Sequence, residues 1–136
     1  SSEVKLTFLQ DSARYLTNQN SGVCPGGKDY CVEIRKGATI TFPVTPQDVQ
    51  IYANLTLSYN MKISGVTASG LGSFTTSYVF DNSPLGFRSG LRTYSLNDAM
   101  YSETFAIPSD GHLLQIVIDF EGIEGDIFFN DFELQG

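Results

Sequence analysis

A cluster of four carboxylates near the end of the chain is the first group that could do chemistry. Its members stand on either side of one turn: Asp119, Glu121, Glu124 and Asp126. Hydrolysis of a glycosidic bond needs two carboxyl groups about 5 to 10 Å apart, one of which protonates the leaving oxygen. The Glu-x-Asp-x-x-Glu pattern that places such groups on one strand in small glucanases is absent. The cluster is therefore interpreted as a solvated acidic hairpin.

The single histidine limits nucleophilic chemistry. His112 ends the turn Ser109-Asp110-Gly111-His112, and any Ser-His-Asp or Cys-His site would have to be built around it. A histidine in such a turn is interpreted as a surface residue rather than a base. The glycines are scattered in turns, and none opens a helix after a strand as in a phosphate-binding loop. The sequence predicts a protein that is not an enzyme.

Two cysteines can form either a disulfide or part of a metal site. Cys24 and Cys31 bracket the turn-forming stretch Pro25-Gly26-Gly27-Lys28-Asp29-Tyr30. A disulfide is favoured, because His112 is far away and no second cysteine pair completes a tetrahedral zinc site. A disulfide indicates an oxidising compartment, and the glycosylation acceptor triplet Asn54-Leu55-Thr56 adds slightly to that case. We expect a protein that is secreted or lies on an extracellular surface.

Composition and length exclude several kinds of partner. The 15 acidic and 8 basic residues give a net charge of -7, which repels nucleic acids and anionic lipid headgroups. No apolar run is long enough to span a membrane, and the first residues lack the basic and apolar regions of a signal peptide. We expect a soluble chain from which any signal peptide has been removed or in which it was never included. With 136 residues and no linker-like stretch, residues 1–136 are expected to form one domain.

Short segments rich in β-branched and aromatic residues recur between clusters of Gly, Pro, Asn, Asp and Ser, which is typical of all-β domains. The expected strands cover residues 4–9, 30–35, 39–44, 53–66, 73–80, 91–96, 101–107, 112–120 and 126–134. One helical turn is expected within residues 11–16. In the segment 53–66 the apolar residues are every second one, so a strand there would have one buried face and one open face: Leu55, Leu57, Tyr59, Met61 and Ile63. This alternation predicts a two-sheet antiparallel β-sandwich.

Two of these expected strands carry polar residues on the open face. Asn60 and Lys62 occupy it in the segment 53–66, and Gln115 and Asp119 occupy it in the segment 112–120. If both strands belong to one sheet, their side chains form a single polar platform flanked by Tyr94.

The end of the chain resembles a known family. Residues 113–120 read LLQIVIDF, and after a Gly-containing turn residues 125–134 read GDIFFNDFEL. This ending resembles the last two strands of the galactose-binding-like jelly rolls. In the xylan- and glucan-binding carbohydrate-binding modules of that superfamily, the final strand carries an Asp or Asn pair, and Asn130-Asp131 stands at that place. The resemblance implies a jelly-roll fold and a polysaccharide ligand.

The resemblance also implies a structural calcium ion. Asp131 matches the terminal-strand ligand of the family, and Glu3 and Asp11 are the candidates for a carboxylate from the N-terminal side. Calcium takes six to eight oxygen ligands, so loop carbonyls would complete the shell. The alternative is that Asp131 joins a hydrogen-bond network without a metal.

Exposed aromatic residues are the informative ones for a sugar ligand, because a sugar stacks its apolar face on a ring while polar side chains bind its hydroxyls. In the expected strand 91–96, Tyr94 and Arg92 point to the opposite side from Leu91, which predicts that both are exposed. Phe87 lies in the expected loop 81–90. Tyr78 shares its phase with two phenylalanines, so it lines the core, which is favoured, or a groove. The candidate ligand-binding residues are Tyr94, Arg92, Asn60, Lys62, Gln115, Tyr78 and Phe87.

The leading hypothesis is a noncatalytic carbohydrate-binding module attached to a larger secreted or surface protein. The chain has no tryptophan, which favours single polysaccharide chains or chain ends over flat crystalline surfaces. The alternative is an extracellular adhesion or receptor module that binds a protein through exposed aromatic residues. A small polysaccharide hydrolase or lyase is the third hypothesis.

Overall fold

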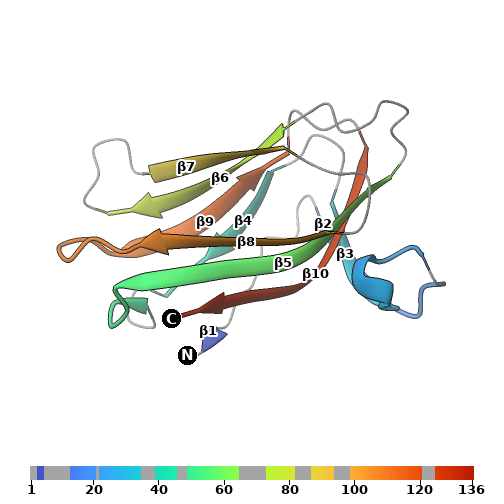
Figure 1. The fold of residues 1–136 in the computed structure, drawn as a ribbon, viewed down its shortest axis with the longest axis horizontal. Coiled ribbons are helices and arrows are strands. Elements are labelled where there is room, and N and C mark those ends of the chain that lie inside the picture. Colours follow the sequence, from blue (N-terminus) through green and yellow to red (C-terminus); the bar gives the residue numbers. More distant parts are fainter. Residues whose placement is uncertain are drawn as a thin grey trace.

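In the residues that the structure describes, the regular secondary structure is almost entirely β (Figure 1). The fold comes from a computed structural model that describes residues 3–4, 13–20, 22–34, 39–45, 49–64, 73–81, 87–93, 99–120 and 125–136. The strands in these ranges are β1 (Glu3–Val4), β2 (Ala13–Leu16), β3 (Cys31–Ile34), β4 (Thr39–Pro43), β5 (Asn54–Ser64), β6 (Ser73–Phe80), β7 (Phe87–Thr93), β8 (Ala99–Ala106), β9 (Leu113–Asp119) and β10 (Asp126–Gln135). A three-residue 3-10 turn, η2 (Pro25–Gly27), precedes β3. No helix among these residues has the length and apolar character to cross a membrane.

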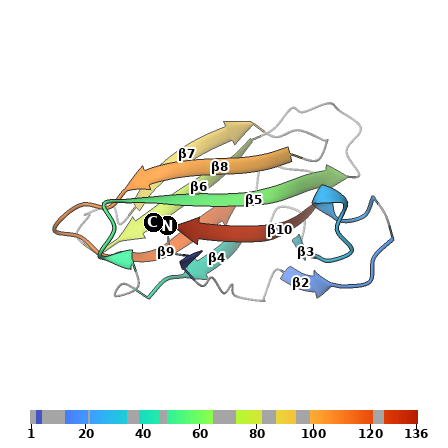
Figure 2. The same ribbon diagram turned by 60° about the horizontal axis from the view of Figure 1, so that its bottom comes forward.

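Two antiparallel sheets pack face to face, as Figures 1 and 2 show from two directions. The six-stranded sheet has the order β2-β3-β10-β5-β8, with β1 paired to β10. The four-stranded sheet has the order β4-β9-β6-β7. The predicted two-sheet antiparallel β-sandwich is therefore confirmed.

The core lies between the sheets and is built by strand alternation. The five apolar residues of β5 that alternate with polar ones are each at most 4% exposed. From the opposite sheet, Ile116 and Ile118 of β9 and Phe74 of β6 join the same cluster. Burial of this apolar surface is the main favourable contribution to folding. The side chains that alternate with these core residues point outward, so they are available for contacts other than core packing.

Two local predictions differ from the structure. Residues 13–16, placed in a helical turn, form strand β2, because they pair with β3 from Ala13 opposite Ile34 to Leu16 opposite Cys31. β7 begins at Phe87, so Phe87 is not in a loop; it pairs with Val79 of β6. In both places a neighbouring strand supplies hydrogen bonds that the local sequence does not reveal.

Candidate functional site

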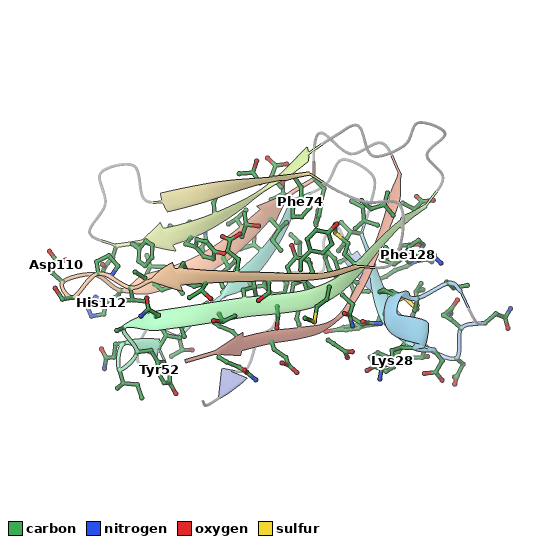
Figure 3. The ribbon with its side chains drawn as sticks, viewed as in Figure 1. Lys28, Tyr52, Phe74, Asp110, His112 and Phe128 are labelled. Atoms are coloured by element: carbon green, nitrogen blue, oxygen red, sulfur yellow. A yellow bond between two sulfur atoms is a disulfide. The ribbon has the colours of Figure 1, made fainter. Side chains whose placement is uncertain are left out.

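A disulfide loop, residues 24–31, covers part of the outer face of the six-stranded sheet. The predicted disulfide is confirmed: the Sγ atoms of Cys24 and Cys31 are 2.03 Å apart. Both cysteines are buried and form a small apolar cluster with Phe128 of β10, and η2 lies against β5 and β10. Figure 3 shows Phe128 and Lys28 at this end of the molecule.

Asn130 fastens this loop to the sheet. Its Nδ2 donates to the carbonyl oxygens of Pro25, at 2.9 Å, and Tyr30, at 3.1 Å. Its Oδ1 accepts a hydrogen bond of 3.1 Å from Nδ2 of Asn60, the residue directly opposite on β5. Both amide hydrogens and the amide oxygen of Asn130 therefore have partners, as a side chain that is only 4% exposed requires.

Asp131 adds a second connection at a β-bulge. The register of β10 against β5 shifts between Asn130 and Glu133, and Asp131 has a φ of 53°, a value that aspartate tolerates better than most residues. Its Oδ1 accepts from the Tyr30 hydroxyl at 2.7 Å, and its Oδ2 accepts from Nδ2 of Asn60 at 3.3 Å. The hydrogen bond to Asp131 raises the pKa of Tyr30, because it stabilises the protonated hydroxyl.

Two predicted ligand-binding residues make hydrogen bonds within the protein. Asn60 donates to both members of the Asn130-Asp131 pair, and Lys62 donates from Nζ to the carbonyl oxygen of Gly22. These side chains position the segment around η2 on the six-stranded sheet.

The residues around Asp131 do not by themselves assemble a calcium shell. Calcium needs several oxygen atoms offering lone pairs, whereas the Asp131 oxygens face a hydroxyl and an amide that donate to them. Glu3 pairs with Gln135, four residues along β10 from Asp131, and Asp11 lies outside the described residues. Among the residues the structure describes, no group of three or more His, Cys, Asp or Glu could hold a metal ion. The contacts fit the metal-free network, and calcium stays a prediction.

The predicted polar platform is wrong in one respect, because its two strands belong to different sheets. Asn60 and Lys62 lie on β5 in the six-stranded sheet, whereas Gln115 and Asp119 lie on β9 in the four-stranded sheet. The two polar faces point away from each other on opposite sides of the sandwich.

The outer face of the four-stranded sheet, called here the four-stranded face, is regular and open. Its residues form three cross-strand rows, in the order β4, β9, β6, β7: Pro43, Gln115, Val79 and Phe87; Thr41, Val117, Ser77 and Ser89; Thr39, Asp119, Thr75 and Leu91. With strands about 4.8 Å apart and about 3.4 Å per residue, the rows cover roughly 14 Å in each direction. The described side chains of β9 and β6 in these rows are half-buried.

This face combines two chemical properties. Threonine and serine hydroxyls and the Gln115 amide supply donors and acceptors, and the Asp119 carboxylate supplies acceptors. The methyl groups of Val79 and Val117 supply apolar surface between them. Such a mixture suits a ligand with hydroxyl groups around apolar ring faces.

The sequence-predicted ligand residues are therefore divided among several places. Gln115 lies on the four-stranded face. In the strand register Phe87 is opposite Val79 and Arg92 is opposite Phe74, and the side chains of both β7 residues lie outside the part of the molecule that the structure describes. Tyr78 lies in the core, 3% exposed, so it is not a groove residue, and Tyr94 is outside the described residues.

Sequence reasoning missed the centre of this face. Thr41, Val117 and Ser77 occupy its middle row, and each is out of phase with the buried residues of its own strand. Their strand phase was readable from the sequence. That their strands belong to the same sheet could not be predicted, because strand pairing between distant segments leaves no local signal in the sequence.

Comparisons with known proteins find similar folds but no similar sequence. No protein-family model and no curated protein matches this chain. Solved structures do. A structure titled "Family 16 Carbohydrate Binding Module-2" aligns with a TM-score of 0.64 at 9% identity, over 93% of this chain and 88% of that one. The CBM22-2 xylan-binding domain of Paenibacillus barcinonensis Xyn10C aligns with a TM-score of 0.66 at 6% identity, over 96% and 91%.

The fold is the jelly roll of carbohydrate-binding modules. The same jelly roll is found inside a longer chain, the CBM22-1 and GH10 modules of Clostridium thermocellum xylanase 10B complexed with xylohexaose. That alignment has a TM-score of 0.60 at 11% identity and covers 98% of this chain but 28% of that one. The implied jelly-roll architecture is confirmed, and at these identities the likeness concerns the fold.

Proposed function

We propose that this protein is a noncatalytic carbohydrate-binding module that holds a polysaccharide chain across the four-stranded face. The observation that carries the proposal is the alignment of its three rows. Hydroxyl, amide and carboxylate groups repeat across β4, β9 and β6, with aliphatic surface between them. A chain of sugars repeats hydroxyl groups and apolar ring faces in the same way. The jelly rolls of similar structure include xylan-binding domains, which supports this class of ligand.

The distribution of exposed apolar residues argues against a protein-binding surface. Five large apolar side chains are exposed among the described residues, and they lie on five different segments: Tyr15, Tyr30, Ile51, Met100 and Leu114. A protein interface has a contiguous, well-packed centre in which such side chains gather. The described residues form no centre of this kind, so the adhesion hypothesis has less support.

Attachment to a larger secreted protein is part of the proposal. The disulfide supports an oxidising compartment. In the Clostridium thermocellum structure the similar jelly roll accompanies a GH10 module in one chain, which supports a partner domain of that kind. The neighbouring module, rather than this one, would then carry out the hydrolysis.

Affinity gel electrophoresis against soluble xylan, glucans, mannans and pectin tests the proposal. Retardation by at least one polysaccharide is expected, and the absence of retardation by all of them would contradict the proposed function. Ser77→Arg places a long charged side chain at the centre of the four-stranded face. It should weaken binding about tenfold or more, the equivalent of about 1.4 kcal/mol.

Ser58→Arg is the matched control for this variant. Ser58 is also a half-buried mid-strand serine, but it lies on β5 in the other sheet. It should bind as the parent does, with a similar change in melting temperature. If Ser77→Arg does not fold, Gln115→Ala removes a single amide from the same face and should weaken binding with little effect on folding. Equal binding by both serine variants would mean that the ligand lies elsewhere.

A further inference from the structure

One end of the sandwich contains a pocket that the four-stranded face does not include. Its volume is about 410 Å³, and its walls are residues 50–53, which come just before β5, and the turn between β8 and β9. Figure 3 shows Tyr52 from the first segment and His112 from the second at this end of the molecule. Small-molecule pockets have volumes of about 300 to 1,000 Å³, so this one suits a small ligand rather than a polymer.

Backbone hydrogen bonds hold the two walls in place. Within the first wall the Tyr52 N–H donates to the Val49 carbonyl at 3.0 Å, and Val49 is fully buried. The walls are joined where the Ile107 N–H donates to the Ala53 carbonyl at 2.9 Å. The backbone of Gly136 lies against the Tyr52 ring, so closely that a Cβ there would be 2.1 Å from Cδ1. The pocket therefore exists before any ligand arrives.

His112 has a defined orientation in this pocket. Its backbone N–H donates to Oδ1 of Asp81 at 2.8 Å, and its Nδ1 lies 2.7 Å from Oδ2 of the same carboxylate. The backbone hydrogen bond from His112, followed by the side-chain one, lowers the pKa of Asp81. An ionised carboxylate only accepts, so Nδ1 carries the hydrogen and Nε2 is left as the ring nitrogen for another partner.

The lining indicates the chemical class of the ligand. Ile51, Ile107 and Pro108 supply apolar surface next to the Tyr52 ring, and Gln50, Ser109 and His112 supply polar groups. No Lys, Arg, Asp or Glu is among the described residues that line this pocket. An uncharged ring with several hydroxyl groups matches both properties.

We propose that this end pocket is a second binding site, which takes a single neutral sugar residue such as the end of a glycan chain. The class of ligand rests on the proposed function, but the site does not. His112 stands three residues before Gln115 of the four-stranded face, so the pocket lies next to the start of β9. Tyr52 supplies a ring face, and His112 and Gln50 bind hydroxyl groups.

Backbone amide NMR spectra of the whole chain, titrated with D-xylose, D-glucose, D-galactose and D-mannose, test the inference. At least one sugar should shift the amide signals of Ile51, Ser109 and His112. Cyclohexanol, a ring of similar size with one hydroxyl, should shift them much less. Ile51→Arg should weaken the response about tenfold by filling the rim, and His112→Ala should weaken it by up to about tenfold through the lost hydrogen bond.

Met100→Arg is the matched control. Ile51 and Met100 are 76% and 73% exposed, so both accept an arginine without loss of core packing, but Met100 lies on β8 away from the pocket. Its sugar response should equal that of the parent. The inference is overturned if no sugar shifts the pocket signals, if Ile51→Arg responds as Met100→Arg does, or if cyclohexanol acts as well as the sugars. Failure here with polysaccharide binding intact removes only the second site, whereas failure of both removes the proposed function as well.

Discussion

Asn60 and Asn130 face each other directly across β5 and β10, and their side-chain amides are joined by a hydrogen bond of 3.1 Å. The side chain of Asn130 also donates hydrogen bonds to the carbonyl oxygens of Pro25 and Tyr30. Two strands of the sheet and the disulfide loop are thus held by one small amide network. Of these residues Asn60 is a predicted ligand-binding residue, and its side-chain hydrogen bonds are internal.

Asn130→Ala should therefore lower the free energy of unfolding. The change leaves the buried carbonyl of Pro25 and the partly buried carbonyl of Tyr30 without their donor, and loss of such a partner costs about 1 to 3 kcal/mol for a buried group. Urea unfolding of the variant against Asn20→Ala, an exposed asparagine outside the sheets, measures the difference. Equal stability of the two variants would show that the network contributes nothing.

Removal of the disulfide by the double change Cys24→Ser and Cys31→Ser should leave the fold intact. The closed loop is short, with a sequence separation of 7, so the loss should be about 2 kcal/mol at most. Hydrogen exchange should rise in residues 22–30 and stay unchanged in β9. Global loss of the β-sheet circular dichroism signal would contradict this expectation, as would two free thiols in the unreduced, unfolded parent.

The His112 contacts predict an acid-dependent contribution to stability. The pKa of Asp81 is lowered in the folded state, so its contribution is present above the ordinary aspartate pKa and is lost as the pH falls through the folded value. Asp81→Asn should be less stable than the parent at pH 7, and the gap should narrow below about pH 4. Urea unfolding at a series of pH values measures it, and a gap independent of pH would contradict the assignment to Asp81.

Calcium separates the two interpretations of Asp131. If Asp131 is a calcium ligand as predicted, millimolar calcium should raise the melting temperature of metal-free protein and a chelator should lower it; if the donors that face both of its oxygens complete a metal-free network, neither should change it. An ion that binds only the folded state would raise it by mass action. A rise that Asp131→Asn abolishes would support the calcium prediction, with further ligands from residues such as Asp11, whereas an unchanged melting temperature would contradict it.

Tyr94 and Tyr59 give contrasting expectations. Tyr94→Ala should weaken carbohydrate binding and leave stability nearly unchanged, if its ring is a stacking surface. Tyr59 is 4% exposed and stacks on Phe132 at 4.6 Å, so Tyr59→Ala should cost about 3 kcal/mol or more. Binding isotherms and urea melts on both variants decide between these effects. A Tyr94→Ala protein that binds as the parent does would leave Phe87 as the next candidate.

Strand phase could be predicted from the sequence wherever the alternation was long. Tyr59 and its alternating neighbours in β5 are buried as expected, and β6 spans the expected residues 73–80. Phase is local, because successive side chains of any strand point to opposite faces. Residues 13–16 and Phe87 were misassigned because their strand character depends on pairing with β3 and β6.

The candidate site was harder to predict than the fold, and sheet membership is the reason. Asn60 and Gln115 are both outward-facing polar residues, as expected, yet they lie on opposite layers. Which sheet a strand joins is decided by contacts between distant segments and by the closure of the whole sandwich. The end pocket was missed for the same reason, since Tyr52 and His112 are 60 positions apart in the numbering.

The pairing of β1 with β10 brings Glu3 opposite Gln135, and Figure 2 shows the two ends of the chain next to each other. Both ends belong to the six-stranded sheet, so a tether at either of them leaves the four-stranded face pointing away from the anchor. Chain ends this close can also be joined by a short linker and the chain reopened at an exposed turn. A circular permutant opened at Asp110, in the exposed turn between β8 and β9, would keep every strand of both sheets while moving the attachment point to the rim of the end pocket.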